Sequence, residues 1–210
     1  YQGRGVMQDC SKAREWWEKA AKQENADAQC NLGVMYNHGH GVKQDYSKAR
    51  GWYEKAAKQE DADAQYNLGV MYDQGQGVKQ DYSKAREWYE KAAKQEDANA
   101  QYNLGVMYDN GRGVKQDYSK AREWWEKAAK QGHAQAQFNL GVMYSHGKGV
   151  KQDYFKAREW YEKAAKQGDA TAQGKLGIMY ANGQGVKQDY SKARGWTEKA
   201  AKQGLSKAQY

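Results

Sequence analysis

The stretch Asn31-Leu-Gly-Val-Met-Tyr36 decides the fold, because it returns four times along the chain. Identical copies begin at Asn67, Asn103 and Asn139, and a fourth copy reads Lys175-Leu-Gly-Ile-Met-Tyr180. Successive copies are 36 residues apart. A fixed period of this size is typical of a solenoid, in which each unit buries its apolar face only by stacking on its neighbours.

The residues around this stretch recur with the same spacing, so we expect a single all-α solenoid over residues 1–210. Its predicted parts are a half repeat at 1–24, full repeats at 25–60, 61–96, 97–132, 133–168 and 169–204, and a truncated repeat at 205–210. The chain opens at Tyr1 rather than Met, within a repeat unit. We therefore expect a processed protein or a piece of a longer array, or else end-to-end self-association of copies.

The unit 61–96 shows how each repeat is expected to fold. Apolar residues spaced as one helical face predict a first helix, helix A, over 62–74. Gly75 and Gly77 predict its end and the following turn, because glycine tolerates a positive φ. Gly69 costs stability inside a helix, and its expected use is to let the partner helix approach closely.

A second helix, helix B, is predicted over 82–95. Asp81 precedes it as an N-cap residue. Val78 is expected to fill the apolar gap beneath the loop. The i,i+4 ion pairs expected on the surface of helix B are Glu87–Lys91 and Glu90–Lys94.

The pattern of recurring positions within one unit reads Ala136, Leu140-Gly141, Tyr144, Gly147-Lys-Gly-Val150, Asp153, Lys156-Ala157, Trp160, Lys163-Ala-Ala165 and Gly168. This closely resembles the Sel-one-like repeat (SLR) family, a relative of the tetratricopeptide repeat (TPR). Glu60 and Glu96 depart from it by replacing the closing Gly. The resemblance implies a right-handed superhelix of antiparallel helix pairs that acts as an adaptor or scaffold, with no catalytic residues. Many bacterial members of the family are periplasmic or secreted, and eukaryotic relatives act in the endoplasmic reticulum. The resemblance therefore favours a bacterial protein that is periplasmic or secreted.

Differences between the copies gather on one face of helix A. Six variable positions, headed by residues 27, 30, 31, 34, 37 and 38, follow helical spacing. In the families that the chain resembles, this face lines the concave groove. The alternative is neutral drift at solvent-facing positions, but the exposed face of helix B stays almost constant. We call the predicted partner-binding set the groove face: Asp27, Cys30, Asn31, Val34, Asn37, His38, Asp63, Tyr66, Asn67, Val70, Asp73, Gln74, Asn99, Tyr102, Asn103, Val106, Asp109, Asn110, Gln135, Phe138, Asn139, Val142, Ser145, His146, Thr171, Lys175 and Ile178.

The charge of the groove face changes along the chain. Acidic residues in the early units are Asp27, Asp63, Asp73 and Asp109, whereas the late units lose them and gain Lys175. The unit 61–96 has a net charge of −2, while 133–168 and 169–204 each have +3. We expect an extended peptide or helix that is basic against the early units and acidic against the late ones.

Other classes of function find less support in the sequence. No nucleophile-and-base pattern or cofactor motif is evident, so we expect no enzyme and no cofactor. The repeated Gly75-x-Gly77 lacks the further residues of a phosphate loop, and His38 with His40 lacks a third metal ligand, so no metal is expected. Nucleic acid is a second candidate partner because the chain carries +8, but its cations alternate with glutamates. No run approaches the ~20 apolar residues of a membrane span, so membrane insertion is not expected.

The two cysteines are expected to be free thiols. Cys10 and Cys30 each replace a tyrosine found in other repeats. On antiparallel helices they would lie on the order of 13 Å apart at the helical rise, which is too far for a disulfide. The neighbouring rings Trp124 and Trp125 are expected to pack with one inside and the other at the rim.

Overall fold

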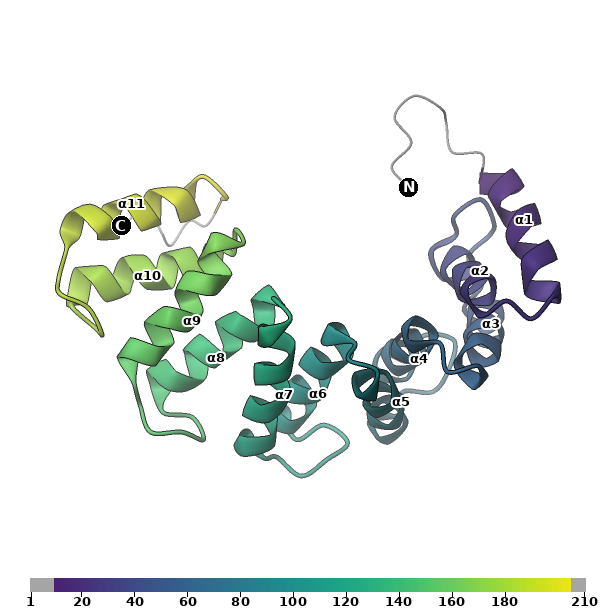
Figure 1. Ribbon diagram of the computed structural model, residues 1–210, viewed down its shortest axis with the longest axis horizontal. Helices are drawn as coiled ribbons and strands as arrows, with labels where there is room; N and C mark the ends of the chain where they lie inside the picture. Colours follow the sequence, from purple (N-terminus) through teal and green to yellow (C-terminus); the bar gives the residue numbers. More distant parts are fainter. Residues whose placement is uncertain (1–9, 205–210) are drawn as a thin grey trace. The chain divides into compact units, whose positions relative to one another are not determined.

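Each 36-residue repeat folds as a hairpin of two antiparallel helices (Figure 1). The computed structural model describes residues 10–204, and this range contains helices and no strand. The helices are α1 (Cys10–Lys22), α2 (Ala26–His38), α3 (Tyr46–Lys58), α4 (Ala62–Gln74), α5 (Tyr82–Lys94), α6 (Ala98–Asn110), α7 (Tyr118–Lys130), α8 (Ala134–His146), α9 (Tyr154–Lys166), α10 (Ala170–Asn182) and α11 (Tyr190–Ala201). The all-α repeat fold is therefore confirmed.

The chain divides into two units, unit 1 (Tyr1–Ala100) and unit 2 (Gln101–Tyr210), and each is described by itself. Within each unit, the second helix of one hairpin also packs on the first helix of the next, as α3 does on α4 and α7 on α8. The single solenoid over 1–210 stays a prediction. The truncated repeat at 205–210, and with it the predicted end-to-end contact, lies outside the described residues, as does the Cys10 side chain.

The first helix of each hairpin begins and ends where its capping residues stand. In α4, Asp61 Oδ1 accepts a hydrogen bond from the Ala64 N–H at 2.7 Å, which satisfies an unpaired donor at the helix start. Gly75 ends the helix with φ of 71° and donates its N–H to the Met71 carbonyl. The observed bounds Ala62–Gln74 confirm the predicted helix over 62–74.

The second helix is capped by an aspartate at its start and ends in a left-handed residue. Asp81 accepts from the Lys84 N–H at 3.0 Å, as predicted, and α5 ends at Lys94, one residue before the predicted end. The residue that closes the hairpin has a positive φ in each repeat. Glu60 and Glu96 both have φ of 65°, where later repeats carry Gly132 and Gly168. The turn therefore keeps its shape despite the Gly-to-Glu replacements.

The two helices of a hairpin meet at a glycine and an aromatic ring. A Cβ added to Gly69 would lie 2.5 Å from two atoms of the Tyr89 ring. Tyr89 is 1% exposed, and Leu68 beside the glycine is fully buried. This confirms that Gly69 permits the close approach of the partner helix. Val78, on the loop, packs against the apolar cluster that contains Leu68, as predicted.

In unit 2 the buried Gln137 connects α8 to the end of α7 and to the residue that follows α9. Gln137 in α8 is 5% exposed and donates to the Ala129 carbonyl at the end of α7 at 3.1 Å. Its own side-chain oxygen accepts from Gln167 after α9 at 2.8 Å. The last carbonyls of a helix have no partner within the helix, and the Ala129 carbonyl also accepts from the Gly132 N–H of the turn. Gln137 therefore adds a bond across the repeat boundary.

The surface of helix B pairs its charges differently from the prediction. Glu90 pairs with Arg86 at 3.6 Å, and the Lys91 ammonium lies 4.0 Å from the centroid of the Trp88 ring. Neither expected pair, Glu87–Lys91 nor Glu90–Lys94, is an ion pair within the described residues. The prediction was wrong because it overlooked the tryptophan ring three residues before the lysine, which attracts the cation.

Candidate functional site

The groove face lies between the core and solvent in both units. Its aromatic, aliphatic and amide positions are half-buried, among them Tyr66, Val70 and Asp73. Its exposed positions are Asp27, His38, Asp63, Gln74, Asn99, Asn110, Gln135, His146, Thr171 and Ile178. Its half-buried positions are Asn31, Val34, Asn37, Tyr66, Asn67, Val70, Asp73, Tyr102, Asn103, Val106, Asp109, Phe138, Asn139, Val142, Ser145 and Lys175.

Cys30 departs from the rest of the groove face. It is 7% exposed and belongs to the apolar cluster formed with Tyr53 and Leu68. Burial raises the pKa of the Cys30 thiol, and the carboxylates of Asp61 and Asp63 raise it further. Cys30 is a free thiol, as predicted. The smaller side chain sinks into the core where Tyr66 and Tyr102 stay half-buried, so Cys30 offers little surface to a partner.

Unit 2 contains a pocket between α6 and α8 with a volume of about 240 Å³. Six of its lining residues belong to the predicted groove face. The full lining is Tyr102, Val106, Asp109, Asn110, Trp125, Asn139, Val142, Met143 and Lys148. The structure thus brings together groove-face residues from two successive repeats in one concave site, which both apolar and polar side chains line.

Tyr102 is held in place on one wall of this pocket. Its ring stacks on the ring of His133, with centroids 4.6 Å apart and planes 18° apart. Burial raises the pKa of Tyr102, and the neighbouring Asn139 side chain lowers it in part. A ring held by stacking loses little rotamer freedom when a ligand binds, which favours binding.

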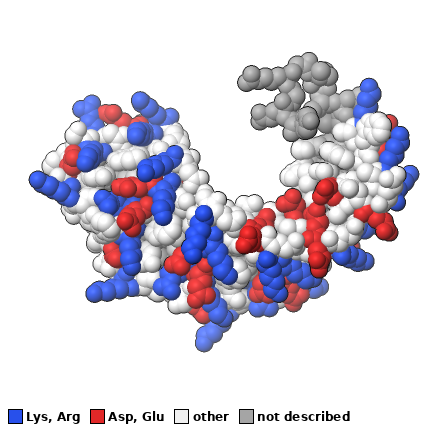
Figure 2. All heavy atoms as spheres, viewed as in Figure 1, with Lys and Arg blue, Asp and Glu red and all other residues white. Residues whose placement is uncertain are grey.

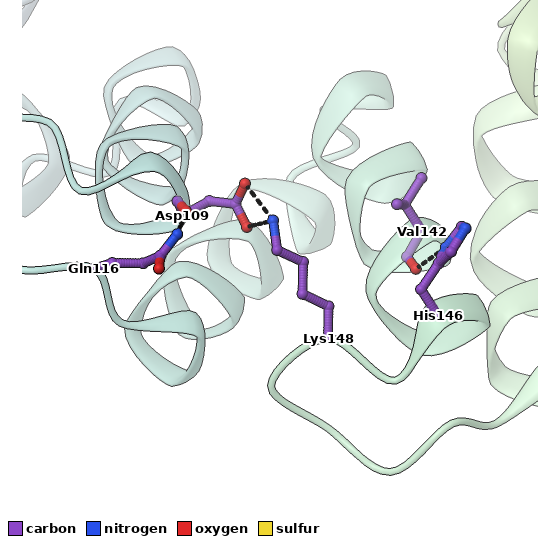
Figure 3. Close-up of polar contacts among 5 residues, drawn as sticks. All are labelled: Asp109, Gln116, Val142, His146 and Lys148. Atoms are coloured by element: carbon purple, nitrogen blue, oxygen red, sulfur yellow. Dashed lines mark hydrogen bonds and ion pairs between the residues drawn. The ribbon is translucent and has the colours of Figure 1, made fainter.

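An ion pair between successive repeats lies at the rim of the pocket (Figure 3). The Lys148 ammonium, on the loop after α8, lies 2.7 Å and 2.9 Å from the two carboxylate oxygens of Asp109 in α6. Lys148 also lies 4.6 Å from the centroid of the Tyr118 ring. The side chain of Asp109 is 16% exposed and that of Lys148 is 37% exposed. Asp109 was predicted to add acid to the groove face, but its charge is neutralised by Lys148.

Trp125 forms the inner wall of the pocket and gives this repeat its particular shape. Its indole N–H donates to the backbone carbonyl of Tyr102 at 3.1 Å. At the equivalent position of the next repeat, the Tyr161 hydroxyl lies 3.1 Å from the Ser145 hydroxyl. Trp125 carries no hydroxyl that could reach Asp109 in the same way. Trp125 is 3% exposed and Trp124 half-buried, as predicted for the inner and outer rings.

Sequence reasoning missed Trp125, Met143 and Lys148 as parts of the site. The Trp125 and Met143 positions look like core, because equivalent residues elsewhere are buried. Lys148 is one of many lysines in the chain, and no sequence signal distinguishes it before the loop is placed. The ion pair could have been found by a comparison between repeats. Lys148 lies between the two loop glycines of one repeat, and Asp109 lies at the end of helix A in the repeat before it.

In unit 1 the groove face carries exposed Asp27 and Asp63, and Tyr66 packs on Tyr89 with ring centroids 5.9 Å apart. The rings of His38 and His40 stack on each other at 5.4 Å. Among the described residues there is no group of three or more His, Cys, Asp or Glu that could hold a metal ion.

Comparison with models of known families identifies the family to which the sequence belongs. The model of the Sel1 repeat matches six times, at residues 1–25, 26–61, 62–97, 98–133, 134–169 and 170–205. The chain belongs to the Sel1 repeat family. Proteins with Sel1 repeats generally act as scaffolds for protein interactions, and the family is typically not catalytic. No curated protein matches the sequence.

Solved structures of Sel1 repeat proteins agree with this fold. A protective antigen of uropathogenic Escherichia coli strains, which displays an SLR fold, is 42% identical with a TM-score of 0.95. It aligns with 100% of this chain, whereas this chain covers 45% of the antigen. A Sel1 repeat protein from Oxalobacter formigenes is 39% identical over 94% of this chain and 82% of its own, with a TM-score of 0.87. An immunity protein from Pseudomonas aeruginosa, 22% identical over 98% of this chain and 77% of its own with a TM-score of 0.60, shares the fold alone.

No helix within the described residues is long and apolar enough to cross a membrane.

Proposed function

We propose that this Sel1 repeat protein binds protein or peptide partners through the groove face of its first helices. The observation that carries the proposal is the pocket of unit 2. Six groove-face residues, chosen from sequence variation alone, line one concave site together. Concave, mostly apolar sites with a few polar groups at the rim are the usual setting for ligand recognition.

The charges of the two units suggest which segments each would bind. Residues 1–100 have a formal net charge of −1, and the rest of the chain has +9. On the groove face, unit 1 exposes Asp27 and Asp63, while unit 2 has Asp109 neutralised by Lys148 and also carries Lys175. We infer that a basic segment suits unit 1 and an acidic segment suits unit 2.

A capture experiment tests the proposal. The double variant Tyr66→Ala with Tyr102→Ala removes one half-buried ring from the groove face of each unit. We expect partners captured by the wild-type chain to be lost, because aromatic anchors carry much of the energy at binding sites. Helicity measured by circular dichroism should stay near that of the wild type.

A matched control keeps the groove face intact. Ser83→Ala with Ser119→Ala changes two exposed positions on the second helices. This control should capture the same partners as the wild type. Equal loss in both double variants, or no loss in the tyrosine variant, would refute the groove face as the binding surface.

The basic helices do not favour a polyanion as the main ligand. Lysines of the second helices lie over tryptophan rings, as Lys127 does over Trp124 at 4.2 Å. Arginines pair with glutamates four residues on, as Arg122 does with Glu126 at 3.5 Å. Figure 2 shows basic and acidic side chains interleaved over these helices. Their positive charge is thus already compensated locally.

A further inference from the structure

The pocket of unit 2 has a size that suits one side chain rather than a whole small ligand. Its volume of about 240 Å³ lies below the roughly 300–1,000 Å³ typical of sites for drug-sized molecules. Its walls are Tyr102, Val106, Trp125 and Val142, which are aromatic or aliphatic. An open pocket with these apolar walls, on an extended groove face, suits an anchor residue of a longer chain.

The charged residues at the rim of the pocket determine which charge the bound segment should carry. Asp109 is the acidic residue of the lining, and Lys148 neutralises it from the loop after α8. The ammonium of Lys148 is the more exposed partner, at 37% against 16% for Asp109. Asn139 adds a further polar group to the lining. An approaching carboxylate therefore meets a cation before it meets the less exposed carboxylate of Asp109.

We infer that this pocket holds a single bulky apolar side chain, such as Trp or Phe, from an acidic peptide segment whose carboxylates contact Lys148. The inference rests on the proposed function and adds the chemistry of the partner at one site. Charge complementarity on the groove face supports the acidic partner, because Lys148 is more exposed than Asp109 and Lys175 adds a second cation to this face of unit 2. The ring of the anchor would lie among Tyr102, Trp125 and Val142, where aromatic contacts add to the burial of apolar area.

Short fluorescein-labelled peptides test the inference by fluorescence polarisation with the full chain. One peptide has Asp and Glu around a central Trp, a second has Ala in place of that Trp, and a third has Lys in place of the acids. We expect the acidic Trp peptide to bind about tenfold or more tightly than either of the others. Equal binding of the Ala peptide or of the Lys peptide would overturn the inference, and so would a failure of the acidic Trp peptide to bind.

Two rim variants predict shifts of opposite sign. Asp109→Asn removes the carboxylate that competes for Lys148, so affinity for the acidic Trp peptide should rise about threefold. Lys148→Gln introduces the residue found at the equivalent positions Gln76 and Gln184, and affinity should fall. If Asp109→Asn weakened binding instead, a basic partner would be indicated and the inference would be wrong.

A pocket-filling variant locates the site. Val142→Phe places a ring in the pocket and should weaken binding of the acidic Trp peptide by about tenfold. Ser119→Phe, at an exposed position of α7 where the next repeat carries the exposed Phe155, should leave that affinity unchanged. Should the Val142→Phe chain fail to fold, the rim variants still decide the question, because they nearly conserve the size of the side chains.

The results also separate this inference from the proposed function. Binding of the Lys peptide that is lost in the Tyr66→Ala, Tyr102→Ala variant would support the groove face and contradict the acidic partner. Loss of captured partners in the tyrosine variant, with no response to the rim and Val142 variants, would again leave only the broader proposal.

Discussion

At the scale of single residues, the closing position of each hairpin shows how backbone conformation limits stability. Glu96 has φ of 65°, a left-handed conformation that costs a non-glycine residue roughly 1–2 kcal/mol. Glu96→Gly should therefore raise the free energy of unfolding by about 1 kcal/mol, after allowance for the greater freedom of glycine in the unfolded chain. Urea denaturation followed by circular dichroism measures this change.

The matched control reverses the substitution in a later repeat. Gly132 has φ of 89°, and a Cβ added there would contact no other atom within 4 Å. Gly132→Ala should lower stability by about 1 kcal/mol for reasons of backbone conformation alone. Two changes of the same sign would show that the left-handed turn does not limit stability.

Gly69, inside the first helix, is needed for close packing rather than for a positive φ. A second pair of variants distinguishes the packing role of a glycine from its effect on helix propensity. Gly69→Ala places a Cβ 2.5 Å from the buried ring of Tyr89, so it should destabilise the chain by about 1–3 kcal/mol. Gly51 lies in α3 with no atom within 4 Å of an added Cβ. Gly51→Ala should therefore stabilise by up to about 1 kcal/mol. Thermal unfolding of both variants checks the contrast, which would vanish if helix propensity alone were decisive.

The buried thiol of Cys30 makes stability depend on pH. Burial and nearby carboxylates raise its pKa above the ~8.5 of an unfolded thiol. The unfolded chain therefore ionises first, so the stabilising contribution is complete below that value and is lost as pH rises above it. Between about pH 8 and about pH 10, a chain carrying Cys10→Ser should lose more stability than one that also carries Cys30→Ala.

Thiol labelling gives an independent check of Cys30. In the Cys10→Ser background, dithiobis-nitrobenzoate should react slowly with the folded chain and fully in denaturant, because Cys30 is 7% exposed. Fast labelling of the folded chain would contradict the burial of Cys30.

At the scale of helices, glutamine side chains connect one hairpin to the next. Gln137→Ala would remove the bond to the Ala129 carbonyl and the acceptor of the Gln167 side chain, and the loss of these two hydrogen bonds should cost about 1–3 kcal/mol. Gln135→Ala, two residues earlier in α8 at an exposed position, should change stability by less than about 0.5 kcal/mol. Urea denaturation compares them, and similar losses in both would refute the structural role of Gln137.

Helices follow from the sequence here more fully than the site does. The bounds of α4 were predicted because Asp61 and Gly75 act through local hydrogen bonds and φ angles, which depend on neighbouring residues only. The pocket instead depends on contacts between residues far apart in the chain. Lys148 meets Asp109 from a loop 39 residues later, and Trp125 enters from a third helix. Helical periodicity predicts which face is variable, but it does not show which side chains from other elements complete that face.

At the scale of the whole molecule, total charge is a poor guide to partners. A chain with +8 would be expected to bind polyanions, but its arginines and lysines are paired with glutamates and tryptophans on the second helices. We expect the chain to elute from heparin below the physiological ionic strength of about 0.15 M. Retention well above that ionic strength would favour nucleic acid or another polyanion as the ligand.

The reach of Lys148 back to Asp109 has a consequence for engineering. The pocket does not belong to one 36-residue repeat, since its residues run from Tyr102 in α6 to Lys148 after α8. Grafting a single repeat into another array would separate Lys148 from the Asp109 carboxylate and open the rim of the pocket. A segment that carries the whole pocket must therefore run from α6 through the loop after α8, which is more than one repeat.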